Sequence, residues 1–477
     1  MEVRRQVIPA AMRAPRRAHL VGIAGAGMRA MATVLRGRGW PLSGSDRAGD
    51  PRGELAAVGI RVRCGHAAEN LPEGTDLVVY SDAVPQDNPE LQRAAELGIP
   101  RLSYFEMIGR LMTDKHALAV AGTHGKSTTT AMAAEIFVAA GRDPTVLCGA
   151  ASPGQASGGR HGRGEILLAE ACEYRANFLH LRPQHAVVTG IEPDHFDYYR
   201  SRQELEDAFA QFVGSVPPDG LVLARHDCPT TQRITADLPC RVQTFGLDAA
   251  ADWSARLVST GQARYQLKIY RGGQPWCGAE APVRLPVPGK HNVLNALAAA
   301  ALAGENGVPP QQIARGLERF AGLRRRFEPL GIWRGVLMVD DYAHHPTEVA
   351  ATLATVRRLA PGRRVWCVFQ PHQASRTEHL LDELAESLQN ADRVLVAEIF
   401  RAREGPPGSG DVTAADLARE VLRRGTEVWA IHDVEAISRR LAGSLTPGDV
   451  LITLGAGDIR RVCDGLIDGF REDRAAG

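Results

Sequence analysis

One stretch of sequence decides the fold, an apolar run that leads through a glycine-rich loop into small residues: His116-Ala-Leu-Ala-Val-Ala-Gly122-Thr123-His124-Gly125-Lys126-Ser127-Thr128. The apolar run predicts a buried strand, and the Thr- and Ala-rich segment that follows predicts a helix. Glycines let backbone N–H groups face a phosphate, and the start of a helix adds positive potential there. This strand, loop and helix together predict a binding site for a nucleoside triphosphate.

The loop has the GxxGK[ST] form, in which Lys126 contacts the β- and γ-phosphates and Ser127 offers its hydroxyl to Mg²⁺. It is a shortened version, because the first glycine of the longer GxxxxGK[ST] form would fall at Val120. The alternative is a glycine-rich turn that carries an exposed lysine. The strand before the loop and the helix after it favour the phosphate site.

Length and composition set the frame for this site. The chain has 477 residues, which suggests about three domains. Its 56 basic and 55 acidic side chains nearly cancel, so the composition gives no reason to expect nucleic acid or an anionic membrane as a partner. No apolar stretch is long enough for a membrane span, and eight scattered cysteines without metal-like spacing favour a reducing cytoplasm. We therefore expect a cytoplasmic protein without membrane insertion.

Apolar runs alternate with helical patterns along the chain, which is typical of an α/β fold with mostly parallel sheets. The alternation in residues 252–288 instead predicts a group of antiparallel strands. In the last third, strands are expected at 336–339, 365–369, 394–397 and 450–454. The predicted organisation is a basic tail over 1–18 and domains over 19–113, 114–324 and 325–477.

Acidic residues and a histidine follow two further predicted strands. Residues 167–170 read as a strand that ends at Glu170, and residues 187–191 as another that leads to His195. Ligands bind at the carboxyl ends of parallel strands, so Glu170 and His195 are candidates to face Mg²⁺. Nearby residues compete for these roles: Glu173, Asp194 and Asp197. In the alternative interpretation, Asp194 caps a helix that begins near His195, and the glutamates are simply solvated.

At this point the sequence resembles a known family, the Mur ligases, over residues 19–465. The motifs that carry the resemblance follow in the family's order: 122–130, Glu170-Ala-Cys-Glu-Tyr174, Ile191-Glu-Pro-Asp-His195, Gly289-Lys-His-Asn-Val-Leu-Asn295, Arg325-Arg-Phe327, Asp340-Asp-Tyr-Ala-His-His-Pro-Thr-Glu348 and Phe369-Gln-Pro-His372. The resemblance implies three domains: a Rossmann-like UDP-binding domain, a central ATPase-like domain with a phosphate loop, and a C-terminal Rossmann-like α/β domain.

The resemblance also implies roles for individual residues. ATP and Mg²⁺ would be bound by the loop residues Gly122, Thr123, His124, Gly125, Lys126, Ser127 and Thr128, with Glu170 on a first metal and His195 on a second. Asn292 and Asn295 are three residues apart, so they share one helix face, and they look like the adenine-side contacts. Without the family they would be a polar helix face. From the last domain, Arg326 and Asp341 would contact ATP, whereas Tyr342, His344, His345 and Arg376, with His124, would lie near the amino acid and the muramoyl carboxylate.

The first domain resembles the family's UDP-sugar domain. Gly25, Gly27 and Met28 lie at a glycine-rich turn that opens a helix, and Asp46 ends the next strand. His66 and Ser81 resemble that domain's substrate side. Read alone, this pattern would suggest an NAD-dependent dehydrogenase, yet the glycine spacing is GxxGxG rather than GxGxxG.

Several residues depart from the family's pattern. Ser127 replaces Thr and keeps the hydroxyl, whereas Ala24 and Gly190 replace Gly and Asn. Gln373 replaces an arginine, which removes a charge near the expected amino-acid site. There is no lysine between Lys126 and Lys268, so the carbamoylated lysine of some sister ligases is absent, as in the branch that adds L-alanine.

The implied reaction joins L-alanine to the lactyl carboxylate of UDP-N-acetylmuramate through an acyl phosphate, with ATP and Mg²⁺, in peptidoglycan precursor synthesis. Lys126, Arg326 and the metal would balance the anionic oxygens, and His344 or His345 is a candidate general base with an ordinary pKa near 6.5. The alternatives are a sister ligase that attaches a preformed peptide and a non-catalytic nucleotide sensor. We expect a monomer or weak homodimer.

Overall fold

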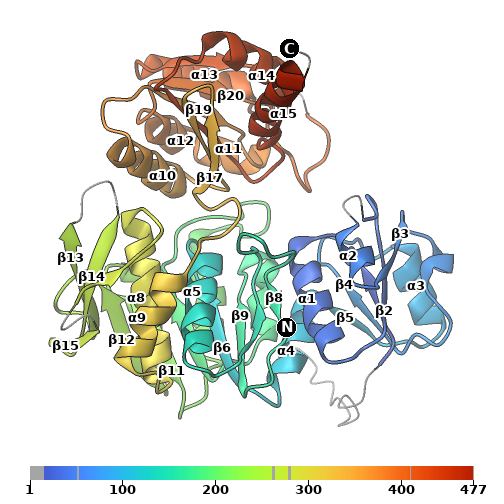
Figure 1. Ribbon diagram of the computed structural model, residues 1–477. Helices are drawn as coiled ribbons and strands as arrows, with labels where there is room; N and C mark the ends of the chain where they lie inside the picture. Colours follow the sequence, from blue (N-terminus) through green and yellow to red (C-terminus); the bar gives the residue numbers. More distant parts are fainter. Residues whose placement is uncertain (1–15, 51–52, 260–263, 278–280, 409, 476–477) are drawn as a thin grey trace. The chain divides into compact units, whose positions relative to one another are not determined.

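The computed structural model describes residues 16–50, 53–259, 264–277, 281–408 and 410–475 (Figure 1). Contacts between residues divide the chain into two units, which are treated separately below: Met1–Ala119 with Arg142–Ala171 and Asn177–Gln184, and Val120–Gly141 with Cys172–Ala176 and His185–Gly477. The domain boundaries at 113/114 and 324/325 stay predictions. Residues 1–15 of the predicted tail lie outside the described residues. Its last residues belong to the fold, because Arg17 donates to Asp76 and Ala18 begins a strand.

The first unit contains a five-stranded parallel sheet in the order β3-β2-β1-β4-β5, which is the order of a Rossmann-type sheet. Its strands are β1 (Ala18–Val21), β2 (Leu42–Asp46), β3 (Arg61–Cys64), β4 (Leu77–Tyr80) and β5 (Arg101–Ser103). The connecting helices are α1 (Ala26–Gly37), α2 (Glu54–Ala57), α3 (Pro89–Glu96) and α4 (Tyr104–Met112), with a 3₁₀ turn at Ala68–Asn70. The expected strand end at Asp46 is confirmed.

The same unit holds three further strands in the order β9-β7-β8: β7 (Thr145–Leu147), β8 (Gly159–Arg160) and β9 (Ile166–Glu170). β7 pairs in parallel with β9 and antiparallel with β8. The 3₁₀ segment Tyr174–His180 is interrupted at Arg175 and Ala176, which both have positive φ, and the chain passes from one unit to the other there. Strand β6 (His116–Ala121) also begins in the first unit and ends in the second.

The second unit contains strands in the order β15-β14-β13-β12-β11-β10. Those that pair in parallel are β10 (His185–Val188), β11 (Leu221–Arg225), β12 (Arg241–Gly246) and β13 (Trp253–Ser259). The antiparallel partners are β14 (Tyr265–Arg271), β15 (Gln274–Cys277) and β16 (Val283–Arg284). The predicted antiparallel group in 252–288 is therefore confirmed.

Helix α5 (Lys126–Ala139) follows β6 and packs against α8 (Lys290–Glu305) and α9 (Pro310–Arg319). The contact with α9 is tight, because a Cβ on Gly316 would lie 2.4 Å from the Ile136 Cα. Small side chains let two helix backbones approach closely, and α8 buries an almost continuous run of alanines. The other helices of this part are α6 (Arg202–Val213) and α7 (Pro229–Thr235).

The C-terminal part of the second unit has a six-stranded sheet in the order β17-β18-β22-β19-β20-β21, in which only β17 runs antiparallel to its neighbour among the described strands. The strands are β17 (Glu328–Trp333), β18 (Val336–Asp341), β19 (Val365–Phe369), β20 (Arg393–Val396), β21 (Glu427–Ala430) and β22 (Val450–Leu454). The helices are α10 (Pro346–Leu359), α11 (Ala374–His379), α12 (Leu381–Leu388), α13 (Ala414–Arg423), α14 (Val434–Ser444) and α15 (Arg461–Ala475).

Helices cover both faces of this sheet, and each face has its own apolar cluster (Figure 1). One cluster includes Val349 and Leu353 of α10, and the other includes Ile437 and Leu441 of α14. The four strands predicted in this part are confirmed to within two residues, whereas β17 and β21 were not predicted.

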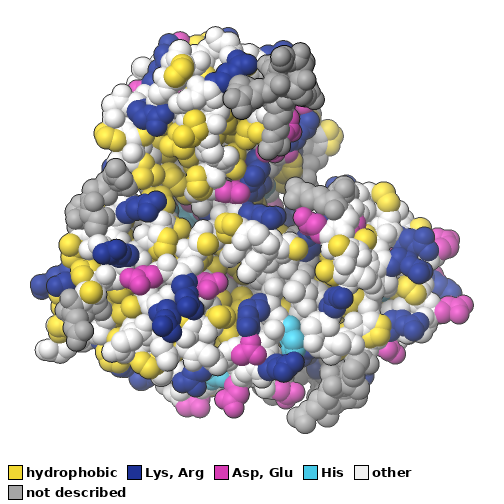
Figure 2. All heavy atoms as spheres, in the orientation of Figure 1, with side chains coloured by type: hydrophobic (Ala, Val, Ile, Leu, Met, Phe, Trp, Pro, Cys, Tyr) yellow, Lys and Arg dark blue, Asp and Glu magenta, His cyan; other side chains and the backbone are white. Residues whose placement is uncertain are grey.

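The distribution of charged side chains on the surface and the polarity of the helices can be compared with the near-zero net charge and the lack of long apolar stretches in the sequence. On the face shown in Figure 2, basic and acidic side chains are interspersed. Among the described residues, no helix combines the length and apolar character that crossing a membrane requires.

Candidate active site

The predicted strand, loop and helix of the phosphate site are confirmed. β6 ends at Ala121 and α5 begins at Lys126, so Gly122 to Gly125 form the turn between them. Gly122 and Gly125 have φ angles of 129° and 80°, which residues other than glycine rarely adopt. A Cβ on Gly125 would lie 2.3 Å from the Asn295 Oδ1. Both conformation and space therefore require glycine at this position.

Lys126 is held inside its own loop. Its Nζ donates to the carbonyls of Gly122 and Thr123 at 2.6 and 3.0 Å, and it lies 2.8 Å from the Glu173 Oε2. Ser127, the next residue, is buried at the start of α5. Burial raises the pKa of Glu173, but the charges of Lys126 and His195 outweigh it and leave that pKa lowered. Glu173 is thus an anion that pairs with the loop cation.

His195 contacts the same glutamate, with its Nε2 3.2 Å from the Glu173 Oε1. The alternative in which Asp194 caps a helix near His195 is wrong, because His195 has a φ of 57° and the next α-helix begins at Arg202. Asp194 instead accepts a 2.7 Å hydrogen bond from the buried Arg376 Nε. Burial raises the pKa of Asp194, but His195 and Arg376 hold it well below its usual range.

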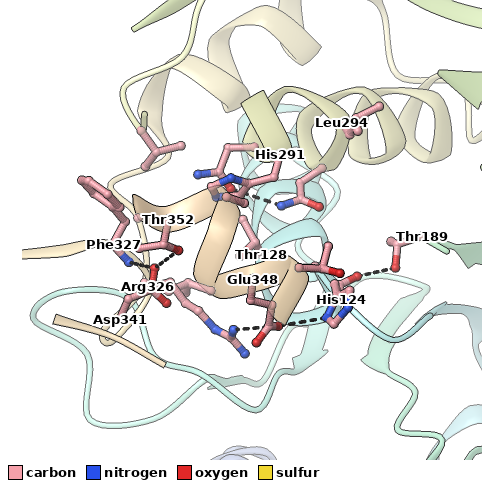
Figure 3. Close-up of a pocket in the computed structure, with 18 of the residues that line it drawn as sticks. His124, Thr128, Thr189, His291, Leu294, Arg326, Phe327, Asp341, Glu348 and Thr352 are labelled. Carbon is pink, nitrogen blue, oxygen red and sulfur yellow. Dashed lines mark hydrogen bonds and ion pairs between the residues drawn. The ribbon is translucent and has the colours of Figure 1, made fainter. Parts of the chain in front are cut away.

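His124 lies between two carboxylates. Its Nδ1 is 3.1 Å from the Glu348 Oε1 (Figure 3). Its Nε2 is 3.4 Å from the Glu192 Oε2. Burial lowers the pKa of His124, but hydrogen bonds to Glu192 and Glu348 raise it to about 9. His124 is therefore a cation at neutral pH, and it links the phosphate loop to α10.

A pocket joins the phosphate loop, α8 and the C-terminal sheet. The predicted residues that line it are His124, Gly125, Thr128, Asn292, Asn295, Arg326 and Asp341 (Figure 3). The prediction that Asn292 and Asn295 share one helix face is confirmed, because the Asn295 Nδ2 donates to the Asn292 Oδ1 at 3.1 Å. Thr129 in turn donates to the Asn295 Oδ1, so the asparagine pair is fixed against the loop helix.

Asp341 lies at the end of β18 and faces this pocket (Figure 3). Its carboxylate accepts hydrogen bonds from the Phe327 N, the Ala343 N and the Thr352 hydroxyl, at 3.0 to 3.2 Å. Burial raises the pKa of Asp341 to about 6, against the opposing charge of Arg326. The Arg326 guanidinium lies over the Tyr342 ring, 5.0 Å from its centroid.

A second group of predicted residues gathers beside Asp194. The His344 Nδ1 donates to the Tyr342 carbonyl at 2.9 Å, and the Arg376 Nη1 lies 2.7 Å from the His372 Nδ1. The expected ordinary pKa of His344 is wrong, because burial and the charge of Arg376 lower it to about 4. Burial likewise lowers the pKa of His345. Both imidazoles are therefore neutral at pH 7.

Glu170 belongs to the first unit, at the end of β9 as predicted. Its Oε2 accepts a 2.7 Å hydrogen bond from the Gly149 N and lies 3.7 Å from the Cys148 Sγ.

The glycine-rich turn of the first unit leads into α1, with Gly25 at the helix N-cap. Asp46 accepts a 3.0 Å hydrogen bond from the Ala24 N, so this carboxylate fixes the turn. A Cβ on Gly27 would lie 3.1 Å from the Tyr104 ring, which favours glycine there. The Met28 side chain is buried in the core, so a ligand at the turn would meet its backbone.

His66 belongs to a buried network around Glu90. The two Glu90 oxygens contact the His66 Nδ1 at 3.1 Å, the His19 Nε2 at 2.8 Å, and the side chains of Ser45 and Asn70. Burial raises the pKa of Glu90, but these hydrogen bonds outweigh it and lower the pKa to about 2. Ser81, the other predicted residue, accepts a hydrogen bond from the Ala83 N.

The functional residues that sequence reasoning missed are the two carboxylates, Glu348 and Glu192, that flank His124. Glu173 was named as a competitor for a metal-facing role, but its pairing with Lys126 was not predicted. Glu192 and Glu348 lie inside quoted motifs, but their partners are distant in sequence. The only sequence signal for them is their place in the motifs: Glu348 follows His344 by four residues, and Glu192 precedes His195 by three.

Family profiles match three segments of the chain: a Mur ligase family catalytic domain at residues 17–116, a Mur ligase middle domain at 120–303, and a Mur ligase glutamate ligase domain at 325–457. The chain belongs to the Mur ligase family.

Individual relatives are more specific. A UDP-N-acetylmuramate–L-alanine ligase of Sorangium cellulosum is 40% identical over 94% of this chain and 96% of that protein. The crystal structure of a UDP-N-acetylmuramate-alanine ligase from Thermotoga maritima superimposes with a TM-score of 0.79, at 26% identity, over 96% of this chain and all of the other. A murein peptide ligase from Psychrobacter arcticus has a TM-score of 0.71, at 25% identity, over 95% of this chain and 98% of that one.

Proposed function

We propose that this chain is an ATP-dependent ligase that joins L-alanine to the lactyl carboxylate of UDP-N-acetylmuramate, in peptidoglycan precursor synthesis. The observation that carries the proposal is the phosphate loop with Lys126, set beside an asparagine-lined pocket, in a chain that matches L-alanine ligases along 94% of its length. ATP is the phosphoryl donor.

The reaction needs ATP because a carboxylate and an amine do not condense spontaneously in water. The carboxylate oxygen attacks the γ-phosphorus, so an acyl phosphate forms and ADP leaves. The neutral amine of L-alanine then attacks the acyl carbon, and inorganic phosphate leaves as the amide forms. In such transfers the protein contributes mainly positioning and charge neutralisation.

Lys126 and Arg326 are the cations proposed to balance the phosphate oxygens. Lys126 is already anchored by two loop carbonyls, so little side-chain freedom remains to be lost when a phosphate binds. Asn292 and Asn295 of α8 line the pocket beside the loop and are proposed to meet the adenine.

Mg²⁺ is proposed to be held by Ser127, Glu170 and His195. The Ser127 hydroxyl and the Glu170 carboxylate are the oxygen donors that Mg²⁺ prefers, and the Glu173 carboxylate beside His195 adds local negative charge, so the chemistry of these donors suits the ion. When bound, the ion would neutralise charge on the transferred phosphoryl group. Glu173 holds the His195 ring in place through its Nε2.

His344 is proposed to orient the amine of L-alanine by a hydrogen bond, and not to act as the general base that removes its proton. Because its Nδ1 donates to the Tyr342 carbonyl, its Nε2 carries the lone pair and can accept a hydrogen bond. A pKa of about 4 makes it a weak base toward an ammonium group. Arg376, fixed by Asp194, is proposed to meet a carboxylate of the substrates.

The first unit is proposed to hold the UDP part of the sugar nucleotide. The N-terminus of α1 follows the turn at Gly25, and a helix N-terminus attracts a diphosphate. Gly27, Asp46, His66 and Ser81 surround the carboxyl end of this sheet, where ligands of parallel sheets bind.

A cytoplasmic location and a monomer or weak homodimer are also proposed. All eight cysteines lie among the described residues, and no disulfide joins them there, which suits a reducing compartment.

The deciding experiment offers the purified protein ATP, UDP-N-acetylmuramate and either L-alanine or a tripeptide, and measures phosphate release. We expect turnover with L-alanine, and glycine and L-serine should be slower. Faster turnover with the tripeptide would favour the peptide-ligase alternative, which the likeness to the Psychrobacter structure makes the second candidate. ATP binding without phosphate release under any of these conditions would instead indicate a nucleotide sensor.

A further inference from the structure

Three side chains beside the phosphate loop form a cluster to which the proposed reaction gives no joint role. They are His124 of the loop, Glu192 after β10, and His345 at the start of α10. One nitrogen or oxygen from each lies within 4.8 Å of the other two. We propose that these residues form a binding site for a divalent transition metal, of which Zn²⁺ is the type, distinct from the Mg²⁺ ligands at Ser127, Glu170 and His195.

The distances suit such an ion. The His124 Nε2 and the His345 Nδ1 lie 3.4 and 3.8 Å from the same oxygen, the Glu192 Oε2. Two ligands of a tetrahedral zinc ion, each about 2.0–2.1 Å from the metal, are roughly 3.4 Å apart. The ligand atoms lie within 4.8 Å of one another, so the two imidazoles would need to approach each other by at most about 1.4 Å to complete the triangle.

The other nitrogen of each imidazole already has the partner that metal-binding histidines require. The His124 Nδ1 faces the Glu348 carboxylate at 3.1 Å, and the His345 Nε2 faces the Pro193 carbonyl at 3.3 Å. Both partners only accept hydrogen bonds, so in a neutral ring the proton lies on that nitrogen and the other nitrogen keeps a lone pair. The His345 Nδ1 now accepts the Thr347 N–H at 3.4 Å, and a bound ion would take the place of that contact. His124 is protonated on both nitrogens at neutral pH, so binding of the ion would release one proton to solvent.

Glu192 is oriented as well. Its Oε2 accepts a 2.6 Å hydrogen bond from the Thr347 hydroxyl, and Thr347 lies on the same turn as His345. Each of the three ligands therefore has an outer partner that fixes its direction, as in established metal sites. A divalent cation would also compensate the two carboxylates, Glu192 and Glu348, that flank His124.

The donor set decides the metal. Two imidazoles and one carboxylate suit zinc and its neighbours, whereas Mg²⁺ favours donor sets in which oxygen predominates. Three protein ligands leave a fourth position for water or a substrate oxygen. The ligands come from the phosphate loop, the β10 loop and α10, so a bound ion would hold these three segments together.

The test uses the full-length protein without nucleotide, in excess Mg²⁺, with Co²⁺ as a visible-absorbing substitute for Zn²⁺. We expect cobalt bands of a four- or five-coordinate site that one equivalent of Zn²⁺ removes. His345→Gln and Glu192→Gln should weaken Co²⁺ binding at least ~100-fold, and Glu348→Gln about 10- to 100-fold. His195→Gln is the matched control and should leave the spectrum unchanged.

Three outcomes would overturn the proposal. They are a wild-type protein without the cobalt bands, bands that His195→Gln removes but Glu192→Gln does not, and a thiolate-to-cobalt charge-transfer band, which would assign the ion to a cysteine. Glu192 is more than a third exposed, so its variant should fold even if the buried His345 variant does not. The spectrum needs neither ATP nor UDP-sugar, so this result stands or falls independently of the ligase activity.

Discussion

Lys126 and Glu173 form an ion pair of 2.8 Å at a glutamate whose side chain is only 2% exposed. Lys126 is expected to contact a phosphate, and the negative charge of Glu173 balances its positive charge before any phosphate binds. A buried lysine without a partner would be costly, because burial disfavours its charged form. Glu173 therefore compensates the charge of the loop lysine within the folded chain.

Replacing Glu173 by Gln should separate the two roles of this carboxylate. Loss of the anion removes a repulsive charge near the phosphates, so KM for ATP should stay level or fall. The neutral amide oxygen is a weaker acceptor for the His195 Nε2 than the carboxylate, so kcat should fall about 10- to 100-fold. Steady-state kinetics at saturating UDP-sugar measure both. A raised KM with unchanged kcat would contradict this assignment.

Lys126→Ala should abolish acyl-phosphate formation and leave UDP-N-acetylmuramate binding largely intact. The physical reason is that Lys126 lies in the second unit, whereas the proposed UDP site is built from residues of the first. Phosphate release and calorimetric titration with the UDP-sugar measure the two properties. Loss of both properties would contradict the assignment of phosphate transfer to the second unit and UDP-sugar binding to the first. Circular dichroism of the variant checks that it is folded.

Glu90 should make the stability of the first unit depend on acid pH. Its folded pKa of about 2 lies below the ordinary 4.5, so its contribution is present above pH 4.5 and is lost as pH falls toward 2. The difference corresponds to ~3 kcal/mol. Calorimetry should therefore show Glu90→Gln well below wild type at pH 7, with the gap shrinking toward pH 3. Exposed Glu96→Gln is the control and should show no such trend.

Asp194 and Arg376 should behave as a buried pair. Asp194→Asn leaves a guanidinium that is 2% exposed without its carboxylate, which typically costs about 3–5 kcal/mol. The double variant Asp194→Asn, Arg376→Met should cost less than Asp194→Asn alone, because no charge is then stranded. Urea unfolding of both variants tests this. Equal losses in the single and double variants would mean that packing, not charge, dominates at this site.

Much of this site could be predicted because its signals are local. The strand, glycine turn and helix around Lys126 occupy one continuous stretch, and the spacing of Asn292 and Asn295 alone places them on one helix face. The strands β19 and β22 are short apolar runs that are buried in full, and their bounds were predicted to the residue.

What could not be predicted depends on residues far apart in the chain. β17 contains Pro329 and Gly331, which usually weaken a strand, yet it pairs at the sheet edge, where such residues are tolerated. The lowered pKa of His344 results from burial and from Arg376, neither of which sequence spacing reveals. The pairing of Lys126 with Glu173, 47 residues away, likewise exists only in the folded chain.

The close approach of Gly125 to Asn295 has a consequence for how this protein can evolve. The Asn295 amide oxygen occupies the space that any side chain at position 125 would need, and the φ of 80° resists one independently. The turn that is proposed to receive phosphate is therefore held to glycine at position 125 by its own backbone and by a side chain of α8. Resistance to an inhibitor that touches Gly125 should not arise by substitution at that position.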